Sequence, residues 1–357
     1  MLAPGRSTDA RCVAPVDSLS ALDLLLQHRP GNVVSRLGHA PLPALSPRTI
    51  LAGLKRSTAV LVAFPVIRPE LVPALLRAAR FEEAVIGFSV PLPVIDRAGP
   101  ERLASLLIDA TSEAEHTQPV FLQAGPIPVE RADESTQAAI HRCVEAGCTL
   151  ITLEATALGS DAPEILAPLV APLREAELAL ELILPVNGPP PATGPLRRTL
   201  DALAAAGCLP DFLRFSPRAV SAGAQLEPDW LQLLRQVTDS YGIALSVQES
   251  SGDPLRAIAP WVRGGVGKVD VTGAFLDRAL GEEGEAQRDE LVERSLAMNV
   301  SMGELLSLLA GRLPALSERD SLRLEARAFS DAQDLLRAMR LAGSGRRVIE
   351  MLAAGAD

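Results

Sequence analysis

The chain has 357 residues and a formal net charge of −10; 48% of its residues are apolar and only 3% are aromatic. This length allows one large domain or two ordinary ones, with a core built mainly from Leu, Ala and Val. The acidic balance argues against a nucleic-acid-binding protein, because phosphates require a basic face.

Residues 1–45 are punctuated by prolines, and we expect them to be irregular apart from one short helix near 18–27. From residue 46 onward, short apolar segments alternate with helical patterns. Eight of the apolar segments are predicted strands: 58–64, 83–90, 119–124, 149–155, 178–184, 211–216, 243–249 and 267–272. The predicted helices are 47–56 before the first strand, then 69–80, 99–114, 130–146, 162–177, 195–206, 227–240 and 254–263.

Strands that alternate with helices indicate parallel βαβ units, and strands without polar alternation indicate a sheet that is covered on both faces. Eight such units predict a closed (β/α)8 TIM barrel over residues 46–280. The alternative is an open, doubly wound sheet. Such a sheet usually carries a glycine-rich turn after its first strand, but here that turn reads "PVIRPE".

After residue 280 the pattern becomes charged and helical. Helices are predicted near 285–297, 301–311, 317–328, 330–342 and 344–353. We interpret residues 281–357 as an all-helical C-terminal extension that serves packing, self-association or contact with a partner subunit. The chain therefore divides into three predicted parts, with the irregular segment 1–45 first and the barrel between it and the extension.

No apolar stretch is long enough to span a bilayer, and the amino-terminal region lacks the apolar core of a signal peptide. We therefore expect a cytoplasmic protein without membrane association. The four cysteines show neither CxxC spacing nor zinc-ligand spacing with histidines. They are interpreted as reduced thiols, and no cofactor is expected.

Active sites of barrels lie at the carboxyl ends of the strands. Two carboxylates at such ends, Glu154 and Glu249, are the candidate acid/base residues, because burial there could raise a carboxyl pKa. A small-residue turn after the seventh strand, before a helix start, is a candidate phosphate site because backbone N–H groups and the helix dipole favour anions. The candidate phosphate-binding residues are Ser250, Ser251 and Gly252 of that turn, with Arg218 and Thr272. The same turn could equally be an ordinary helix cap.

The other reactive side chains do not lie at the carboxyl ends of the predicted strands. None of the four histidines, His28, His39, His116 and His141, falls at the carboxyl end of a predicted strand. Lys268 stands at the start of the last strand, where a Schiff-base lysine could not reach the barrel mouth.

Four segments in order resemble the class II, zinc-dependent ketose-bisphosphate aldolases. "SPRTILAGLKRSTAVLVAFPV" is similar to the family's opening helix and first strand, and "CVEAGCTLITLEAT" to its segment around the fourth strand. "LSVQESSG" is similar to the seventh-strand segment, and "GGVGKVDVTGAF" to the eighth, which carries a Lys-x-Asn motif in the family. The resemblance implies the barrel fold and a phosphorylated sugar as ligand.

The zinc ligands that the resemblance implies are missing. Gly125 and Pro126 stand where the family has its catalytic Asp and first zinc His, and "FSPRAVSAG" contains no second His. Gln248 replaces the third His, and Asp270 replaces the phosphate-binding Asn. The matching residues that remain are Glu154, Thr156, Ser251 and Gly252.

Without three nitrogen ligands, zinc cannot be held in the family's way. We therefore expect a degenerate aldolase-like barrel without a metal, acting as a non-catalytic, assembly or regulatory component. The alternative is a metal-independent lyase acting on a sugar phosphate or a related carbonyl compound.

Overall fold

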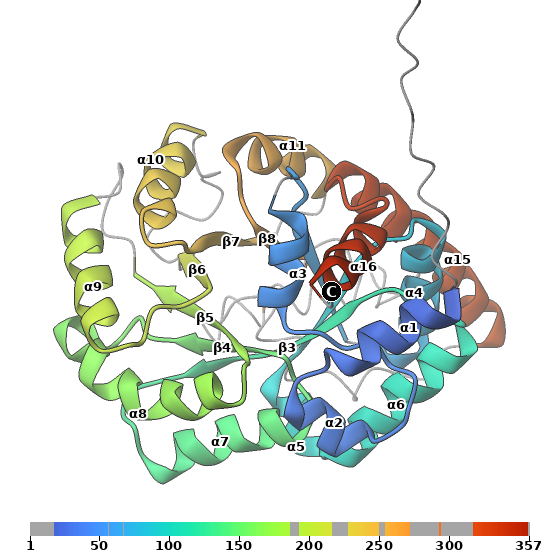
Figure 1. Ribbon diagram of the computed structural model, residues 1–357, viewed down its shortest axis with the longest axis horizontal. Coiled ribbons are helices and arrows are strands. Elements are labelled where there is room, and N and C mark those ends of the chain that lie inside the picture. Colours follow the sequence, from blue (N-terminus) through green and yellow to red (C-terminus); the bar gives the residue numbers. More distant parts are fainter. Residues whose placement is uncertain are drawn as a thin grey trace, which may run out of the picture.

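The computed structural model describes residues 18–55, 57–66, 68–185, 193–215, 228–249, 254–271, 293 and 317–355. Eight parallel strands close into a barrel in the order β1 to β8 (Figure 1). The predicted (β/α)8 barrel is confirmed, and the open sheet is wrong because β1 pairs with both β2 and β8. The strands are β1 (Leu61–Pro65), β2 (Ile86–Val90), β3 (Val120–Pro128), β4 (Leu150–Glu154), β5 (Ala179–Leu184), β6 (Phe212–Phe215), β7 (Ala244–Glu249) and β8 (Lys268–Val271).

The helices that follow the strands form the outer ring of the barrel, and the helices that precede β1 cover its amino end. Before β1 lie α1 (Ser18–Gln27), α2 (Gly31–Leu37) and α3 (Pro47–Leu54). Those after β1 are α4 (Val72–Phe81, preceded by the 3-10 turn η1, Pro69–Leu71), α5 (Leu92–Ala98), α6 (Pro100–Glu113), α7 (Glu134–Glu145), α8 (Ala162–Glu175, preceded by the turn η2, Gly159–Asp161), α9 (Thr193–Ala205), α10 (Pro228–Asp239), α11 (Pro254–Gly264), α15 (Glu318–Ala338) and α16 (Ser344–Ala354).

Local signals explain where helices begin and end. The Asp133 side chain caps α7 by accepting a hydrogen bond of 2.9 Å from the Thr136 amide. The same helix ends at Glu145 and is followed by Gly147, whose φ of +81° suits glycine, and the Cys148 amide donates a hydrogen bond back to the Cys143 carbonyl. Only a short turn therefore separates the end of α7 at Glu145 from the start of β4 at Leu150.

Four elements differ from the prediction. Helices α2 and α5 fall in segments for which no helix was predicted, because both have only seven residues and too few apolar repeats to give a periodic signal. Strand β3 continues past residue 124 through a register shift against β4. Helix α15 runs unbroken through residue 330, where the sequence pattern suggested two helices.

The last two helices pack on the barrel itself. Helix α15 contacts both α4 and α11, and so takes the position of an eighth outer helix (Figure 1). Its apolar residues Leu324, Ala328 and Leu335 are buried. Helix α16 packs against α3, and a Cβ at Gly53 would lie 2.9 Å from the Val348 Cα. The apolar stripe of α15 is therefore used within the chain.

One glycine makes room for an aromatic ring in the barrel wall. A Cβ at Gly87 on β2 would lie 2.0 Å from the Phe121 Cζ on the neighbouring strand β3. We expect Gly87→Ala to reduce the free energy of unfolding by about 1–3 kcal/mol, since overpacking forces the ring or the backbone to move. Urea denaturation of the variant measures this difference.

Gly31→Ala is the matched control, because nothing lies within 4 Å of a Cβ at that position. It should leave stability within about 0.5 kcal/mol of the parent chain. If Gly87→Ala were equally neutral, Phe121 would not occupy that space in solution.

Candidate functional site

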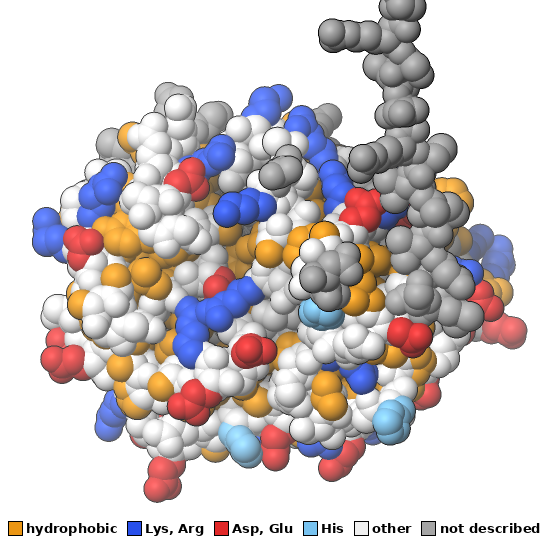
Figure 2. All heavy atoms as spheres, viewed as in Figure 1, with side chains coloured by type: hydrophobic (Ala, Val, Ile, Leu, Met, Phe, Trp, Pro, Cys, Tyr) orange, Lys and Arg blue, Asp and Glu red, His pale blue; other side chains and the backbone are white. Residues whose placement is uncertain are grey.

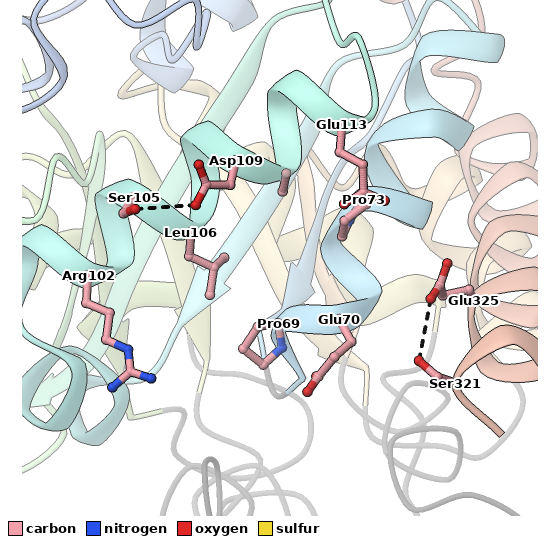
Figure 3. Close-up of a pocket in the computed structure, with 11 residues that line it drawn as sticks. Pro69, Glu70, Pro73, Arg102, Ser105, Leu106, Asp109, Glu113, Ser321 and Glu325 are labelled. Atoms are coloured by element: carbon pink, nitrogen blue, oxygen red, sulfur yellow. Dashed lines mark hydrogen bonds between the residues drawn. The ribbon is translucent and has the colours of Figure 1, made fainter. Parts of the chain in front are cut away.

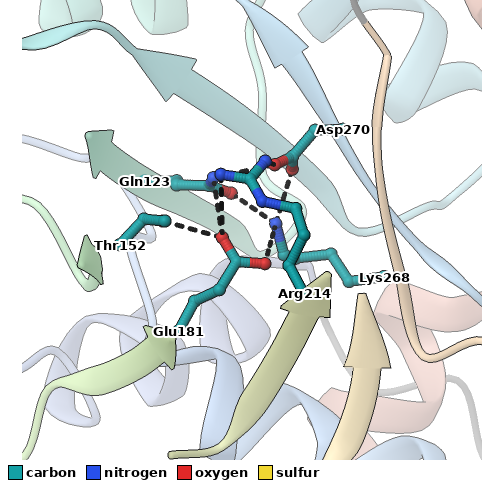
Figure 4. Close-up of polar contacts among 6 residues, drawn as sticks. All are labelled: Gln123, Thr152, Glu181, Arg214, Lys268 and Asp270. Atoms are coloured by element: carbon teal, nitrogen blue, oxygen red, sulfur yellow. Dashed lines mark hydrogen bonds and ion pairs between the residues drawn. The ribbon is translucent and has the colours of Figure 1, made fainter. Parts of the chain in front are cut away.

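Six polar side chains from strands β3, β4, β5, β6 and β8 meet inside the barrel and form a buried network (Figure 4). We call this set the barrel network. Each member is at most 4% exposed, although each belongs to a polar residue type. Its members are Gln123, Thr152, Glu181, Arg214, Lys268 and Asp270.

Lys268 is the centre of the barrel network. Its Nζ lies 2.5 Å from Asp270 Oδ1, 3.1 Å from Glu181 Oε1 and 2.8 Å from Gln123 Oε1. It also lies 5.9 Å from the centroid of the Phe212 ring. With these partners, the ammonium group is fully enclosed by groups that favour its charge.

Arg214 supplies the second cation. Its Nη1 lies 2.6 Å from Asp270 Oδ2, and its Nη2 lies 3.9 Å from Glu181 Oε2. Thr152 donates to Glu181 Oε2 over 2.8 Å, and Gln123 Nε2 donates to Asp270 Oδ2 over 3.0 Å. Two cations and two carboxylates therefore neutralise one another.

The charges of the barrel network hold Glu181 ionised. Burial alone would raise the pKa of this carboxyl group, but the nearby positive charges of Lys268 and Arg214 outweigh burial and lower it to about 2. An ion-paired carboxylate with so low a pKa is a poor general base, because it has little affinity for a proton.

The predicted acid/base residue Glu154 is the last residue of β4, at the carboxyl end of the barrel. It is half-buried, and its Oε1 accepts a hydrogen bond of 3.0 Å from the Thr156 hydroxyl. Glu249 is the last residue of β7, where its backbone pairs with Val271, and its side chain lies outside the described part. The predicted phosphate-binding residues Arg218, Ser250, Ser251, Gly252 and Thr272 all lie outside the described residues.

All four histidines of the chain are described, and none lies at the carboxyl ends of the strands. His28 and His39 precede the barrel, and His141 is on the outer helix α7. His116 precedes β3 at the amino end of the barrel. A zinc site of the kind the resemblance implies, with imidazole ligands at the mouth, does not fit these positions. Among the described residues, no three His, Cys, Asp or Glu side chains come together in a way that could hold a metal ion.

His116 is buried in a way that makes stability depend on pH. Burial lowers its pKa to about 4, against the opposing effect of a 3.0 Å hydrogen bond between Nδ1 and the Leu76 carbonyl. Between the ordinary value of 6.5 and about 4, the unfolded chain binds a proton that the folded chain does not. This residue should therefore remove about 3 kcal/mol of stability as the pH falls through that window.

Denaturation at several pH values checks this expectation. The His116→Asn variant should lose that part of the pH dependence, whatever its stability at neutral pH. His141→Asn is the control, because His141 is an exposed residue on α7. An equal pH slope in both variants would show that His116 does not stay neutral in the fold.

A groove with a volume of about 560 Å³ lies outside the barrel, between α4, α6 and α15 (Figure 3). Its lining includes the apolar residues Pro73 and Leu106 and the carboxylates of Glu70 and Asp109. It is separate from the barrel network and from Glu154. On the face of the molecule seen in Figure 2, basic and acidic side chains are interspersed.

Sequence reasoning missed most of the barrel network. Glu181 stands within the predicted strand 178–184 and Arg214 within the predicted strand 211–216, and the charge inside each segment was given no role. A single charge flanked by apolar residues in a buried strand is a usable signal, because such a charge requires a partner inside the barrel. Lys268 was correctly predicted at the start of its strand, but its contacts were not foreseen.

The comparisons with known proteins support the fold. No protein-family model matches the chain, and no curated protein is similar in sequence. Among solved structures, the YdjI aldolase from Escherichia coli K12 superposes with a TM-score of 0.58 at 12% identity, covering 84% of this chain and 97% of that protein. The fructose-bisphosphate aldolase from Campylobacter jejuni gives a TM-score of 0.58 at 13% identity, covering 84% and 94%.

A putative fructose-1,6-bisphosphate aldolase from Coccidioides immitis gives a TM-score of 0.55 at 16% identity, covering 84% of this chain and 97% of that one. The chain is therefore an aldolase-like TIM barrel in fold. At identities this low, structural similarity indicates a shared fold but not a shared reaction. No helix in the described part has both the length and the apolar character of a membrane span.

Proposed function

We propose that this chain is a degenerate member of the class II aldolases, a non-catalytic barrel that binds a phosphorylated sugar at its mouth. The positions of the histidines carry this proposal. Imidazole is the family's zinc ligand, and every imidazole of the chain lies away from the carboxyl ends of the strands. The carboxyl ends of the strands therefore lack the imidazole ligands that would hold zinc, the ion that acts as the Lewis acid in this family.

The barrel network supports the same proposal. Its charges are directed at one another, with Arg214 and Lys268 both bound to Asp270. A catalytic lysine or carboxylate would need a perturbed pKa that favours proton transfer and access to substrate. Lys268 and Glu181 have no solvent exposure. The charged groups of the barrel network are therefore paired with one another and do not reach the solvent.

A zinc-supplemented assay with fructose 1,6-bisphosphate tests the proposal. We expect no cleavage above the uncatalysed rate, and we expect thermal stabilisation by dihydroxyacetone phosphate. A ligand at a hundredfold excess over its Kd stabilises by about 2.7 kcal/mol, which a melting curve detects. Zinc-dependent cleavage would contradict the non-catalytic assignment, and a melting curve unchanged by the sugar phosphate would contradict ligand binding.

The variant Gln248→His sharpens this test. It restores one of the three imidazoles at a position in β7 that pairs with Asp270. Because two further ligands are missing, we expect no tight zinc binding by calorimetry. Stoichiometric uptake by this single variant would mean that other residues already complete a zinc site at the mouth.

A metal-independent lyase is the second candidate. The observation in its favour is Glu154, half-buried at the barrel mouth and oriented by the Thr156 hydroxyl. Such a carboxylate could accept a proton from a bound carbonyl compound. Cleavage that persists in chelator and falls at least about 100-fold in Glu154→Gln would favour this function over the first.

A further inference from the structure

A second cavity lies at the amino end of the barrel, opposite to the end that carries Glu154. Its volume is about 270 Å³, just below the range of about 300–1,000 Å³ that is usual for pockets holding drug-sized ligands. The cavity therefore suits a small ligand. Its lining comes from the start of α3 and from the turns after α1 and α8, and consists of His28, Pro30, Ser46, Arg48, Thr49 and Glu177.

The start of helix α3 faces this cavity with hydrogen-bond donors. The helix begins at Pro47, and the side chain of the N-cap residue Ser46 makes no hydrogen bond to it. The first amides of a helix have no partner within the helix, so those of Arg48 and Thr49 are available to a ligand. Such amides, together with the helix dipole, favour an anion.

The hydroxyl group of Ser46 also points to a ligand. Only 5% of this residue is exposed, and no described residue forms a hydrogen bond with its Oγ. Ser46 lines the cavity at the point where α3 begins. A buried hydroxyl group is normally hydrogen-bonded, and a ligand oxygen at the start of α3 would accept its proton.

The charges beside the cavity favour an oxyanion at one side only. Arg48 Nε lies 2.6 Å from Asp211 Oδ1, and Arg174 Nη1 lies 3.0 Å from Asp211 Oδ2, so two cations share one carboxylate. Arg48 lines the cavity, and its Nη1 and Nη2 form no hydrogen bond with a described residue. Glu177, on the turn after α8, would repel an anion but would accept a hydrogen bond from a hydroxyl group.

We propose that this cavity binds a small phosphate monoester that carries a hydroxyl group. The phosphate group lies at the start of α3, where it accepts hydrogen bonds from the amides of Arg48 and Thr49, from the Ser46 hydroxyl and from the Arg48 guanidinium. The hydroxyl group of the ligand donates to Glu177. The site is separate from the mouth of the barrel, and the inference does not depend on the proposed function.

Calorimetry with three probes tests the class of ligand. Glycerol 3-phosphate, inorganic phosphate and glycerol are titrated separately into the full chain. We expect glycerol 3-phosphate to bind about tenfold more tightly than inorganic phosphate, because only the ester reaches Glu177, and we expect no binding of glycerol. Equal affinities for the ester and inorganic phosphate would overturn the assignment of an ester, and no binding of glycerol 3-phosphate would overturn the site.

The Thr49→Glu variant distinguishes this cavity from the mouth of the barrel. It places a carboxylate at the third helical position of α3, where the new charge repels a phosphate group but suits the helix dipole, so the fold should be retained. We expect glycerol 3-phosphate to bind this cavity at least about tenfold more weakly in the variant. Thr136→Glu is the matched control, because Thr136 holds the same position in α7, and it should bind as the parent chain does. Equal affinities in the two variants would overturn the proposal.

A crystal structure of the parent chain with glycerol 3-phosphate provides a test that needs no variant. We expect phosphate oxygens about 2.7–3.2 Å from the amides of Arg48 and Thr49 and from Ser46 Oγ. Density for the ligand at the mouth of the barrel alone, or no density at the start of α3, would overturn the proposal.

Discussion

The Lys268→Met variant should lose about 3–5 kcal/mol of its free energy of unfolding, which is the usual cost of removing one partner from a buried ion pair. The change leaves Glu181 and Asp270, with exposed fractions of 0% and 4%, facing a single remaining cation. It also removes the donor that holds the Gln123 side-chain oxygen at 2.8 Å. Urea denaturation followed by circular dichroism measures the loss.

The chain contains only two lysines, and the other one provides the control. Lys55 follows α3 and is exposed. The Lys55→Met variant should change stability by no more than about 0.5 kcal/mol, as is usual for surface positions. Comparable losses in the two variants would mean that Lys268 is not enclosed by the barrel network.

A double variant separates charge balance from packing. Lys268→Met combined with Glu181→Gln removes one cation and one carboxylate and leaves the pair Arg214–Asp270, whose closest atoms are 2.6 Å apart. Because a neutral set is restored, we expect the double variant to be more stable than the sum of the single losses predicts, by about 1–3 kcal/mol. Strict additivity would contradict the mutual neutralisation of charges within the barrel network.

Asp211 should be the second most sensitive position, because it joins helices α3 and α8 to the barrel. It lies just before β6 and is 17% exposed, with Arg48 Nε at 2.6 Å and Arg174 Nη1 at 3.0 Å. Its Oδ2 also accepts from the Leu180 amide over 2.8 Å. We expect Asp211→Ala to cost about 2–4 kcal/mol, because two arginines and an amide lose their acceptor.

Two further variants control for this effect. Burial raises the pKa of Asp211 against the opposing effects of the Leu180 and Arg48 hydrogen bonds, so the charge itself carries a desolvation cost. Asp211→Asn keeps an acceptor oxygen and should therefore lose less than Asp211→Ala. The exposed pair Arg142–Asp96, at 2.8 Å, has similar geometry, and Asp96→Ala should cost less than about 1 kcal/mol. Equal losses for Asp96→Ala and Asp211→Ala would show that Asp211 does not connect these elements.

The order of strands and helices could be predicted from the sequence because each strand is a short apolar segment bounded by helix-ending residues. The predicted segment 149–155 contains β4 (Leu150–Glu154), and the predicted segment 178–184 contains β5 (Ala179–Leu184). Helix α5 was missed because its seven residues, "LPVIDRA", are too few to reveal a helical period.

The interior of the barrel was harder to predict. Barrel closure brings residues far apart in sequence, such as Gln123 and Asp270, within 3.0 Å of each other. Nothing local to either residue specifies the other, and the pattern of one strand cannot show which charges on distant strands face it. The placement of Glu154 at a strand end, by contrast, followed from the strand boundary alone.

The zinc content of the purified chain, after saturation with zinc and dialysis, tests the central claim most directly. The account predicts far less than one zinc ion per chain, because the mouth of the barrel has no imidazole to hold it. One tightly held zinc ion per chain, retained at neutral pH and released only by a chelator, would contradict the account.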